Sequence, residues 1–258
     1  MPRFRLPIEY NGGRYSGWQI QKNARTVQGE IDRAVRTVSK RREFELYGSS
    51  RTDAGVHALG QVAHLELYTD LPPESLRRKI NDELPADIHI RRIDTAPHRF
   101  HARHDALARS YLYQISRRRT AFAKPFVWWI REALDVDAMR EAAAGFVGMK
   151  DFEGYTADDS EEKSTLVLVS GVDVAEAGAL VLVRIQGSHF LWKMVRRMVG
   201  VLAAIGRGDL TAADAAAFLR EASRRPAALA APAAGLFLEA VMYTGETGPG
   251  PLRPVFRD

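Results

Sequence analysis

The sequence predicts an α+β fold built from two ferredoxin-like (RRM-like) halves, residues 1–104 and 105–258. Hydrophobic periodicity gives the order strand, helix, strand, strand, helix, strand over residues 3–93. This is the split βαβ pattern of ferredoxin-like domains. A similar order, with one extra helix, runs from residue 110 to residue 243. The 258 residues, 46% hydrophobic and 27% charged, are enough to bury the core of two such halves.

In the first half, residues 3–10 alternate between apolar and polar side chains, and this strand is expected to stop at Asn11-Gly12-Gly13. An apolar stripe predicts a helix over residues 26–42; its members are Val27, Ile31, Ala34, Val35 and Val38. The remaining expected elements are strands over 44–47 and 61–68, a helix over 74–84 stopped by Pro85, and a strand at 88–90.

In the second half we expect a strand over 110–116, a helix over 137–147, and a hairpin of 165–174 and 179–185 around Gly178. A long apolar helix follows over 190–205. Thr211 then opens another helix, with Asp214 as its capping-box partner and Pro226 at the end of the helical region. The last strand is expected over 235–243, and the Gly/Pro-rich residues 244–258 resemble a tail.

Composition excludes several kinds of chemistry. The chain has no cysteine, so disulfides, thiolate nucleophiles and Cys-ligated zinc, including zinc base deaminases, are excluded. His98, His101 and His104 recur every third residue, but Pro97 and Phe100 favour an extended segment, so we expect no metal. The N-terminus is charged and no apolar run is long enough to cross a membrane, which favours a cytoplasmic protein.

The net charge is +5, and arginine greatly outnumbers lysine in runs such as residues 117–119. The planar fork of donors on arginine suits phosphate, which points to a nucleic-acid partner. A GC-rich genome also enriches arginine and alanine, and the Ala-rich stretch 212–234 fits that alternative.

Residues 48–61, GSSRTDAGVHALGQ, form a polar loop between two expected strands. Asp followed by Ala-Gly is common in tight turns, because Asp bonds its own backbone and Gly tolerates positive φ. The alternative is that the loop holds the Asp53 carboxylate for chemistry, since functional residues often lie on loops carried by a rigid scaffold.

Two further segments combine basic and aromatic residues. Residues 99–103 and 108–113 suit base stacking beside phosphate contacts, although Tyr111 and Tyr113 also fit ordinary half-buried strand positions. In residues 187–200 the expected helix places four cations on one face: His189, Lys193, Arg196 and Arg197. Either a carboxylate or RNA phosphate must face this stripe, or it is simply solvated.

Together these segments resemble the tRNA pseudouridine synthase A (TruA) family. The matching residues are 26–30 (TVQGE), 51–58 (RTDAGVHA), 99–103 (RFHAR), parts of 190–200, and 235–243. The resemblance implies two ferredoxin-like halves joined in one mixed, largely antiparallel sheet flanked by helices, with a basic cleft between them. It implies an isomerase that converts uridine to pseudouridine at positions 38, 39 or 40 of tRNA. No cofactor or metal is implied, and the implied assembly is a homodimer.

The resemblance also assigns roles to residues. Asp53 is the implied catalytic carboxylate, Arg196 its paired cation, and Arg51 the residue that helps hold a flipped-out uridine. Tyr111 is expected against the uracil ring, where it assists proton transfer from C5, and Leu236 is expected to line the pocket. The further contacts implied with RNA are His57, Arg103, Lys193 and Arg197.

Three positions depart from the family pattern: the first bears on the backbone of the 48–61 loop, and the other two bear on RNA contacts and on which uridines are modified. Ser50 stands where members usually have Gly, His189 where a small residue is common, and Lys150 where many members have His. Two alternatives stay open: a paralogue acting on a different RNA uridine, and a non-catalytic RNA-binding protein or chaperone with the same fold.

Overall fold

A computed structural model describes residues 1–157, 164–221 and 223–255. The chain forms two compact units, one of residues 1–107 and 237–247, the other of residues 108–236 and 248–258. The change of unit after residue 107 is close to the expected division at residue 104. The last strand differs from expectation, because almost all of it belongs to the first unit. The last three residues of the expected tail, 256–258, lie outside the described residues.

The first unit has the strand order of a ferredoxin-like domain. Its sheet runs β4-β1-β3, with β2 also paired to β3, and these pairs are all antiparallel. The elements are β1 (Arg3–Tyr10), α1 (Val27–Ser39), β2 (Glu45–Gly48), β3 (His57–Glu66), α2 (Pro73–Glu83), β4 (Ile88–Ile90) and β5 (Asp94–Ala96). The α+β class and the ferredoxin-like pattern predicted for this half are confirmed.

Two strands share one edge of β3. Its C-terminal end pairs with β2, from Glu66 opposite Glu45 to Ala63 opposite Gly48. Its N-terminal end pairs in parallel with β11 (Leu236–Met242), where Phe237 lies opposite His57. This parallel pairing explains why the last strand belongs to the first unit. The two pairings together fix the ends of the loop 49–56, since β2 ends just before that loop and β3 begins just after it.

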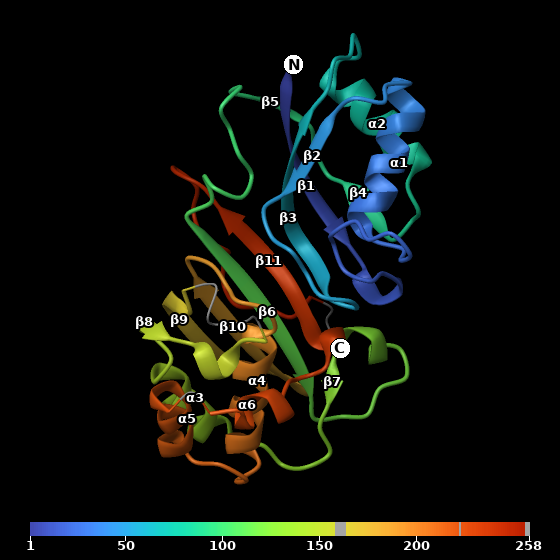
Figure 1. The fold of residues 1–258 in the computed structure, drawn as a ribbon. Coiled ribbons are helices and arrows are strands. Elements are labelled where there is room, and N and C mark those ends of the chain that lie inside the picture. Colours follow the sequence, from blue (N-terminus) through green and yellow to red (C-terminus); the bar gives the residue numbers. More distant parts are fainter. Residues whose placement is uncertain (158–163, 222, 256–258) are drawn as a thin grey trace. The chain divides into compact units, whose positions relative to one another are not determined.

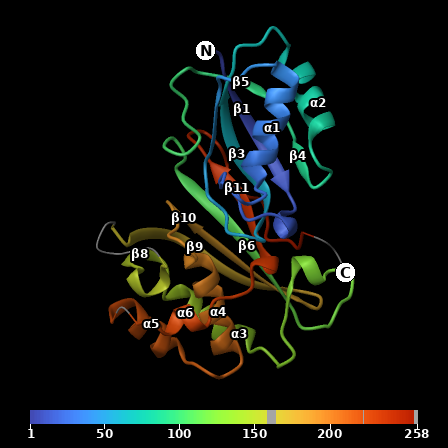
Figure 2. The same cartoon turned by 45° about the vertical axis from the view of Figure 1, so that its right-hand side comes forward.

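Helices α1 and α2 lie side by side on one face of this sheet (Figures 1 and 2). The Thr26 hydroxyl accepts a hydrogen bond from the Gly29 N–H and so caps α1. The apolar stripe predicted for this helix is buried at Val27, Ile31, Ala34 and Val35. Burial of such a stripe stabilises a helix more than its intrinsic propensity does.

The second unit contains the sheet β6-β10-β9-β8, antiparallel throughout, with β7 paired in parallel to β6. Its strands are β6 (Ala108–Ser116), β7 (Trp128–Trp129), β8 (Gly148–Asp151), β9 (Leu166–Ala177) and β10 (Leu180–Gly187). The helices are α3 (Val136–Ala144), α4 (Met194–Gly206), α5 (Ala212–Arg220) and α6 (Arg225–Ala228). Figures 1 and 2 show these helices gathered on one side of β9 and β10.

Several predicted boundaries are corrected by the structure. Strand β3 begins at His57 instead of residue 61, and α4 begins at Met194 instead of residue 190. Pro226 lies in the first turn of α6, where its missing N–H costs nothing, so it opens a helix and does not end one. The predicted capping box of Thr211 and Asp214 and the turn at Gly178 (φ 59°) are both present. In the described part of the chain, no helix combines the length and apolarity needed to cross a bilayer.

Candidate active site

The loop 49–56 carries Asp53 in a tight turn of the first unit. The Val56 N–H donates to the Asp53 carbonyl oxygen at 3.1 Å, and Gly55 has φ 79°. A positive φ at the third position of a four-residue turn is the mark of a type II turn, which favours glycine there. The turn predicted from Asp-Ala-Gly is therefore present.

Two glycines from the N-terminal segment hold this loop by close backbone approach. A Cβ atom on Gly17 would overlap the Thr52 carbonyl oxygen, and Gly17 also has φ 86°. A Cβ on Gly12 would overlap the Val56 carbonyl oxygen. The Trp18 N–H donates to the Thr52 carbonyl oxygen at 3.1 Å. Glycine is needed where backbone passes this close to backbone.

Buried polar side chains fix the loop from the other side. Gln61, fully buried on β3, accepts from the Ser49 hydroxyl at 2.8 Å and donates to the Ser50 carbonyl oxygen at 2.8 Å. The hydroxyls of Tyr10 and Thr52 share a buried hydrogen bond of 2.8 Å. Loss of one partner from such a bond leaves the other unsatisfied. The backbone on both sides of Asp53 is thus held by buried groups.

The three predicted site residues of this segment differ in burial. Arg51 is exposed and Asp53 is half-buried. His57 is 1% exposed; its Nδ1 accepts from the Gly12 N–H at 3.1 Å, and its ring stacks on Phe237 with centroids 4.8 Å apart. His57 therefore packs inside the first unit, and its expected place as an RNA contact is corrected to that of a side chain that supports the loop.

The RFHAR segment, residues 99–103, closes over β3. Its buried Ala102 N–H donates to Nδ1 of His64 at 3.1 Å, and its carbonyl oxygen accepts from the Tyr243 hydroxyl at 2.6 Å. Burial, followed by the neighbouring His101, lowers the pKa of His64 to about 4, so this histidine is neutral near pH 7. Arg103 is exposed and faces solvent from the same segment.

In the second unit, Tyr111 on β6 is 7% exposed. Its ring meets Phe190 edge to face, with centroids 5.2 Å apart and planes at 89°. Leu236 is 4% exposed at the start of β11. Gly235 precedes it, where a Cβ atom would lie 2.7 Å from the Tyr113 ring, so the chain needs glycine to pass this aromatic.

Arg196 and Arg197 both lie in the first turn of α4, and both side chains donate hydrogen bonds to backbone carbonyl groups. Arg196 Nε donates to the Ala231 carbonyl oxygen at 2.7 Å. Arg197 donates to the carbonyl oxygens of Gly154 and Thr156, and burial lowers the pKa of its guanidinium. Backbone carbonyl groups thus satisfy some of the hydrogen-bond donors of each guanidinium. The sequence analysis expected carboxylate, RNA phosphate or solvent there, and not backbone.

The predicted stripe of four cations on one helix face is wrong. His189 and Lys193 precede α4, and Lys193 caps it in the left-handed conformation with φ 61°. The strand pairing continues past β10, since the Ser188 N–H donates to the Leu168 carbonyl oxygen at 2.9 Å, so the helix starts later. Lys193 is half-buried, with Nζ 4.7 Å from the centroid of the Trp192 ring.

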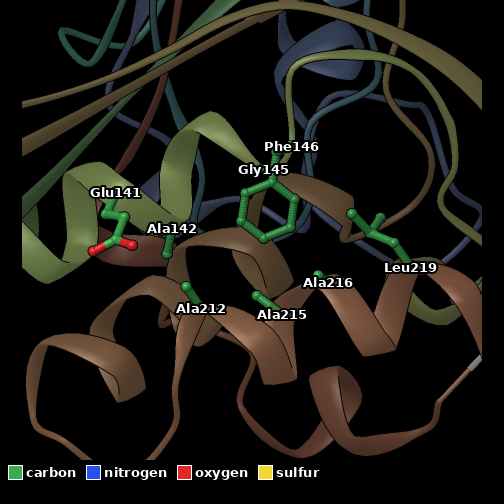
Figure 3. Close-up of a pocket in the computed structure, with 8 residues that line it drawn as sticks. All are labelled: Glu141, Ala142, Gly145, Phe146, Ala212, Ala215, Ala216 and Leu219. Atoms are coloured by element: carbon green, nitrogen blue, oxygen red, sulfur yellow. The ribbon is translucent and has the colours of Figure 1, made fainter.

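A small pocket of about 50 Å³ lies between α3 and α5 (Figure 3). Its lining is Glu141, Ala142, Gly145, Phe146, Ala212, Ala215, Ala216 and Leu219. It contains none of the predicted site residues and is far smaller than the few hundred Å³ typical of ligand sites. No group of three or more His, Cys, Asp or Glu residues in the described ranges could hold a metal ion.

Sequence reasoning missed the residues that support the loop, chiefly Gly12, Gly17 and Tyr10. Nothing in the local pattern of residues 10–17 points to residues 52–56, because the two segments meet only in the folded unit. Gln61 carried a weak signal: it is a large polar side chain within a strand whose neighbours are mostly apolar.

The comparisons with known proteins agree on one family. A family model described as tRNA pseudouridine synthase matches residues 8–105 and 142–244. The tRNA pseudouridine synthase A of Syntrophotalea carbinolica is 41% identical over 241 residues, covering 93% of this chain and 95% of that protein. The corresponding protein of Paramagnetospirillum magneticum is 37% identical over 255 residues, covering 96% of this chain and 99% of that protein. That of Pseudothermotoga lettingae is 36% identical over 246 residues, covering 94% of this chain and 100% of that protein.

Among solved structures, the crystal structure of a Cbf5-Nop10-Gar1 complex aligns with 78% of this chain and 45% of that chain, at 12% identity and a TM-score of 0.34. That likeness is too weak to bear on the fold. The sequence matches are strong, because they span nearly the whole chain and include the Asp53 loop. This chain therefore belongs to the tRNA pseudouridine synthase A family of isomerases.

Proposed function

We propose that this protein converts uridine to pseudouridine at positions 38, 39 or 40 in the anticodon arm of tRNA, with Asp53 as the catalytic nucleophile. The observation that supports this most strongly is the packing of the Asp53 loop. Two close-approach glycines and the buried Gln61 hold the backbone on both sides of one half-buried carboxylate. Catalysis depends on such positioning, because small displacements of a reacting group are costly.

The reaction rearranges atoms that are all present in the substrate. The N1–C1′ bond of uridine breaks, the uracil turns, a C5–C1′ bond forms, the C5 proton leaves and N1 gains a proton. A carboxylate can act as the nucleophile, either at C1′ or at C6 of the ring, and a covalent intermediate divides the reaction into easier steps. Because a stacked base is out of reach, the target uridine must be flipped out of the helix.

The other residues take roles around this step. By the family resemblance, Arg196 supplies the cation that pairs with the Asp53 carboxylate. Arg51, exposed on the same loop, helps hold the flipped uridine. Tyr111 lies against the uracil ring and assists removal of the C5 proton, and Leu236 lines the pocket. The exposed Arg103 and the half-buried Lys193 contact RNA phosphates.

Tritium release tests the proposal. Wild-type protein incubated with tRNA carrying tritium at uracil C5 should release tritium, and Asp53→Asn should release none while still binding tRNA. Asp70→Asn is the matched control, since it makes the same change at an exposed carboxylate of the same unit and should behave like wild type. A wild type that releases no tritium from any tRNA would leave the non-catalytic RNA-binding alternative. Mapping of modified sites separates a paralogue acting on other uridines.

We further propose, from the family resemblance, that the protein acts in the cytoplasm as a homodimer. Light scattering of the purified protein measures its mass directly.

A further inference from the structure

Residues 117–131, RRRTAFAKPFVWWIR, are the most strongly basic segment of the chain. They contain five cations, Arg117, Arg118, Arg119, Lys124 and Arg131, and no carboxylate. The net charge of the whole protein is also +5, so the charges in the rest of the chain sum to zero. The segment lies within residues 106–141, which the family model does not match, and none of the proposed catalytic residues belongs to it.

The base of this segment is fixed to β6. Trp128 and Trp129 form β7, in parallel register with Ile115 and Ser116. The Ile130 N–H donates to the Ser116 carbonyl oxygen at 3.0 Å. Gln114, 1% exposed, donates to the Phe126 carbonyl oxygen at 3.0 Å. In Figure 1 the segment is the light green loop that leaves β6 and returns at β7.

The tip is exposed. Phe122 is 96% exposed, the highest value among the large exposed hydrophobic residues of the described chain. All five cations are exposed as well. Burial of a phenylalanine side chain is stabilising, and this residue gains almost none of that stabilisation within the chain. An exposed aromatic among cations is the combination that single-stranded nucleic acid recognises, by base stacking and by phosphate contacts.

Neighbouring contacts strengthen this resemblance to an RNA-binding surface. The Arg119 guanidinium lies over the ring of Trp129, 5.6 Å from its centroid, and Trp129 is 42% exposed. This pair holds a planar cation beside an aromatic face, an arrangement suited to a nucleotide. Arg117 pairs with Glu176 at 2.5 Å, so it anchors the segment to β9.

We propose that residues 117–131 form a second RNA-binding surface, on which an unpaired base of the tRNA substrate stacks on Phe122 while Arg119, Lys124 and Arg131 bind its phosphates. The identity of the RNA rests on the proposed function. The chemistry rests on the segment itself: arginine and lysine with no carboxylate among them favour phosphate, and the exposed ring favours a base.

The first test is Phe122→Ala. Its dissociation constant for a tRNA transcript, measured by filter binding at fixed salt, should rise about 5- to 150-fold, because stacking of one base contributes about 1–3 kcal/mol. Phe122→Trp should restore binding, since it keeps a stacking face. Tyr68→Ala is the matched control: Tyr68 is 58% exposed in the first unit, two residues before Asp70, and its loss should leave the dissociation constant unchanged.

The second test separates charge from stacking. Removal of two phosphate contacts in Arg119→Ala/Lys124→Ala should make the slope of log affinity against log salt shallower by about 1.4–1.8. Phe122→Ala should leave that slope unchanged. Arg41→Ala/Arg42→Ala removes the same charge from an exposed run in the first unit and should also leave it unchanged. An equal change of slope in both double variants would show a general charge effect and overturn the proposal.

Two other results would overturn it. Phe122→Ala could bind tRNA as wild type does, or it could change the mass seen in light scattering, which would make Phe122 a contact between protein copies. Because binding is measured without turnover, this outcome is independent of the tritium assay. A protein without tritium release can still bind tRNA through Phe122, and an active synthase can bind without it.

Discussion

The loop 49–56 and the segment 117–131 are held in opposite ways. The backbone of the first is fixed along its length, by Gly12 and Gly17 on one side and Gln61 on the other. The second is bonded near its base through β7, Gln114 and Arg117, and its tip carries the 96% exposed Phe122. Each follows a strand, and each is bonded by a buried glutamine.

This difference matches the demands of the two proposed tasks. A nucleophile must stand within a fraction of an ångström of its target, and an error of about 1 Å can cost 100-fold in rate. Phosphate attraction falls off slowly with distance, and every base offers a stacking face, so a binding surface tolerates movement. Close packing is therefore expected around Asp53, and exposure around Phe122.

Among the variants that keep Asp53, Gly17→Ala should have the largest effect. The new Cβ would overlap the Thr52 carbonyl oxygen while the residue keeps φ 86°, so the backbone before Asp53 must move. We expect tritium release to fall about 100-fold or more, and the free energy of unfolding, from urea titration, to fall by about 1–3 kcal/mol.

Gly208→Ala is the matched control for that variant. Gly208 has φ 80° and nothing within 4 Å of its ideal Cβ, so it carries the conformational strain without the overlap. It should lose about 1–2 kcal/mol of stability and retain tritium release. If the two variants lost activity equally, close approach at Gly17 would not be what positions Asp53.

The buried Gln61 and Gln114 allow the same substitution to be compared in the loop 49–56 and in the segment 117–131. Gln61→Met and Gln114→Met keep side-chain length but remove hydrogen bonds to their loops, so each should lower the free energy of unfolding by about 1–3 kcal/mol. Tritium release should fall in Gln61→Met, since Gln61 bonds the residues before Arg51 and Asp53. Gln114→Met should show the smaller loss of release. The reverse order would contradict the assignment of the two loops.

Much of this fold was predictable from periodicity. The helix at Val27–Ser39, the hairpin around Gly178 and the capping box at Thr211 follow from local patterns, and all three are present. Strands β5, β7 and β8 (DTA, WW and GMKD) were missed because, unlike β4 (IHI), they show no alternation of apolar and polar residues. The parallel pairing of β11 with β3 was missed because it joins residues about 180 apart in the chain.

The site was predictable where chemistry lies in one segment and not where it depends on packing. The Asp-Ala-Gly turn was expected and is present. The cationic stripe was wrong because Lys193 stands in the left-handed conformation before α4 begins, which periodicity cannot detect. His57 was expected at the RNA surface, but its ring is buried against Phe237, a residue 180 positions away in the chain.

Ser50→Gly should have the smallest effect. Ser50 contacts Gln61 through its backbone, with its carbonyl oxygen 2.8 Å from Nε2 and its nitrogen 3.3 Å from Oε1. In the described chain, positive φ outside glycine is limited to Lys40 and Lys193, so the backbone here does not require the glycine usual in the family. The variant should lose less than about 1 kcal/mol of stability, through the more flexible unfolded chain. Its tritium release should change by less than about twofold. A larger change in release, with stability preserved, would mean that the Ser50 hydroxyl itself acts on the Asp53 loop or on the RNA.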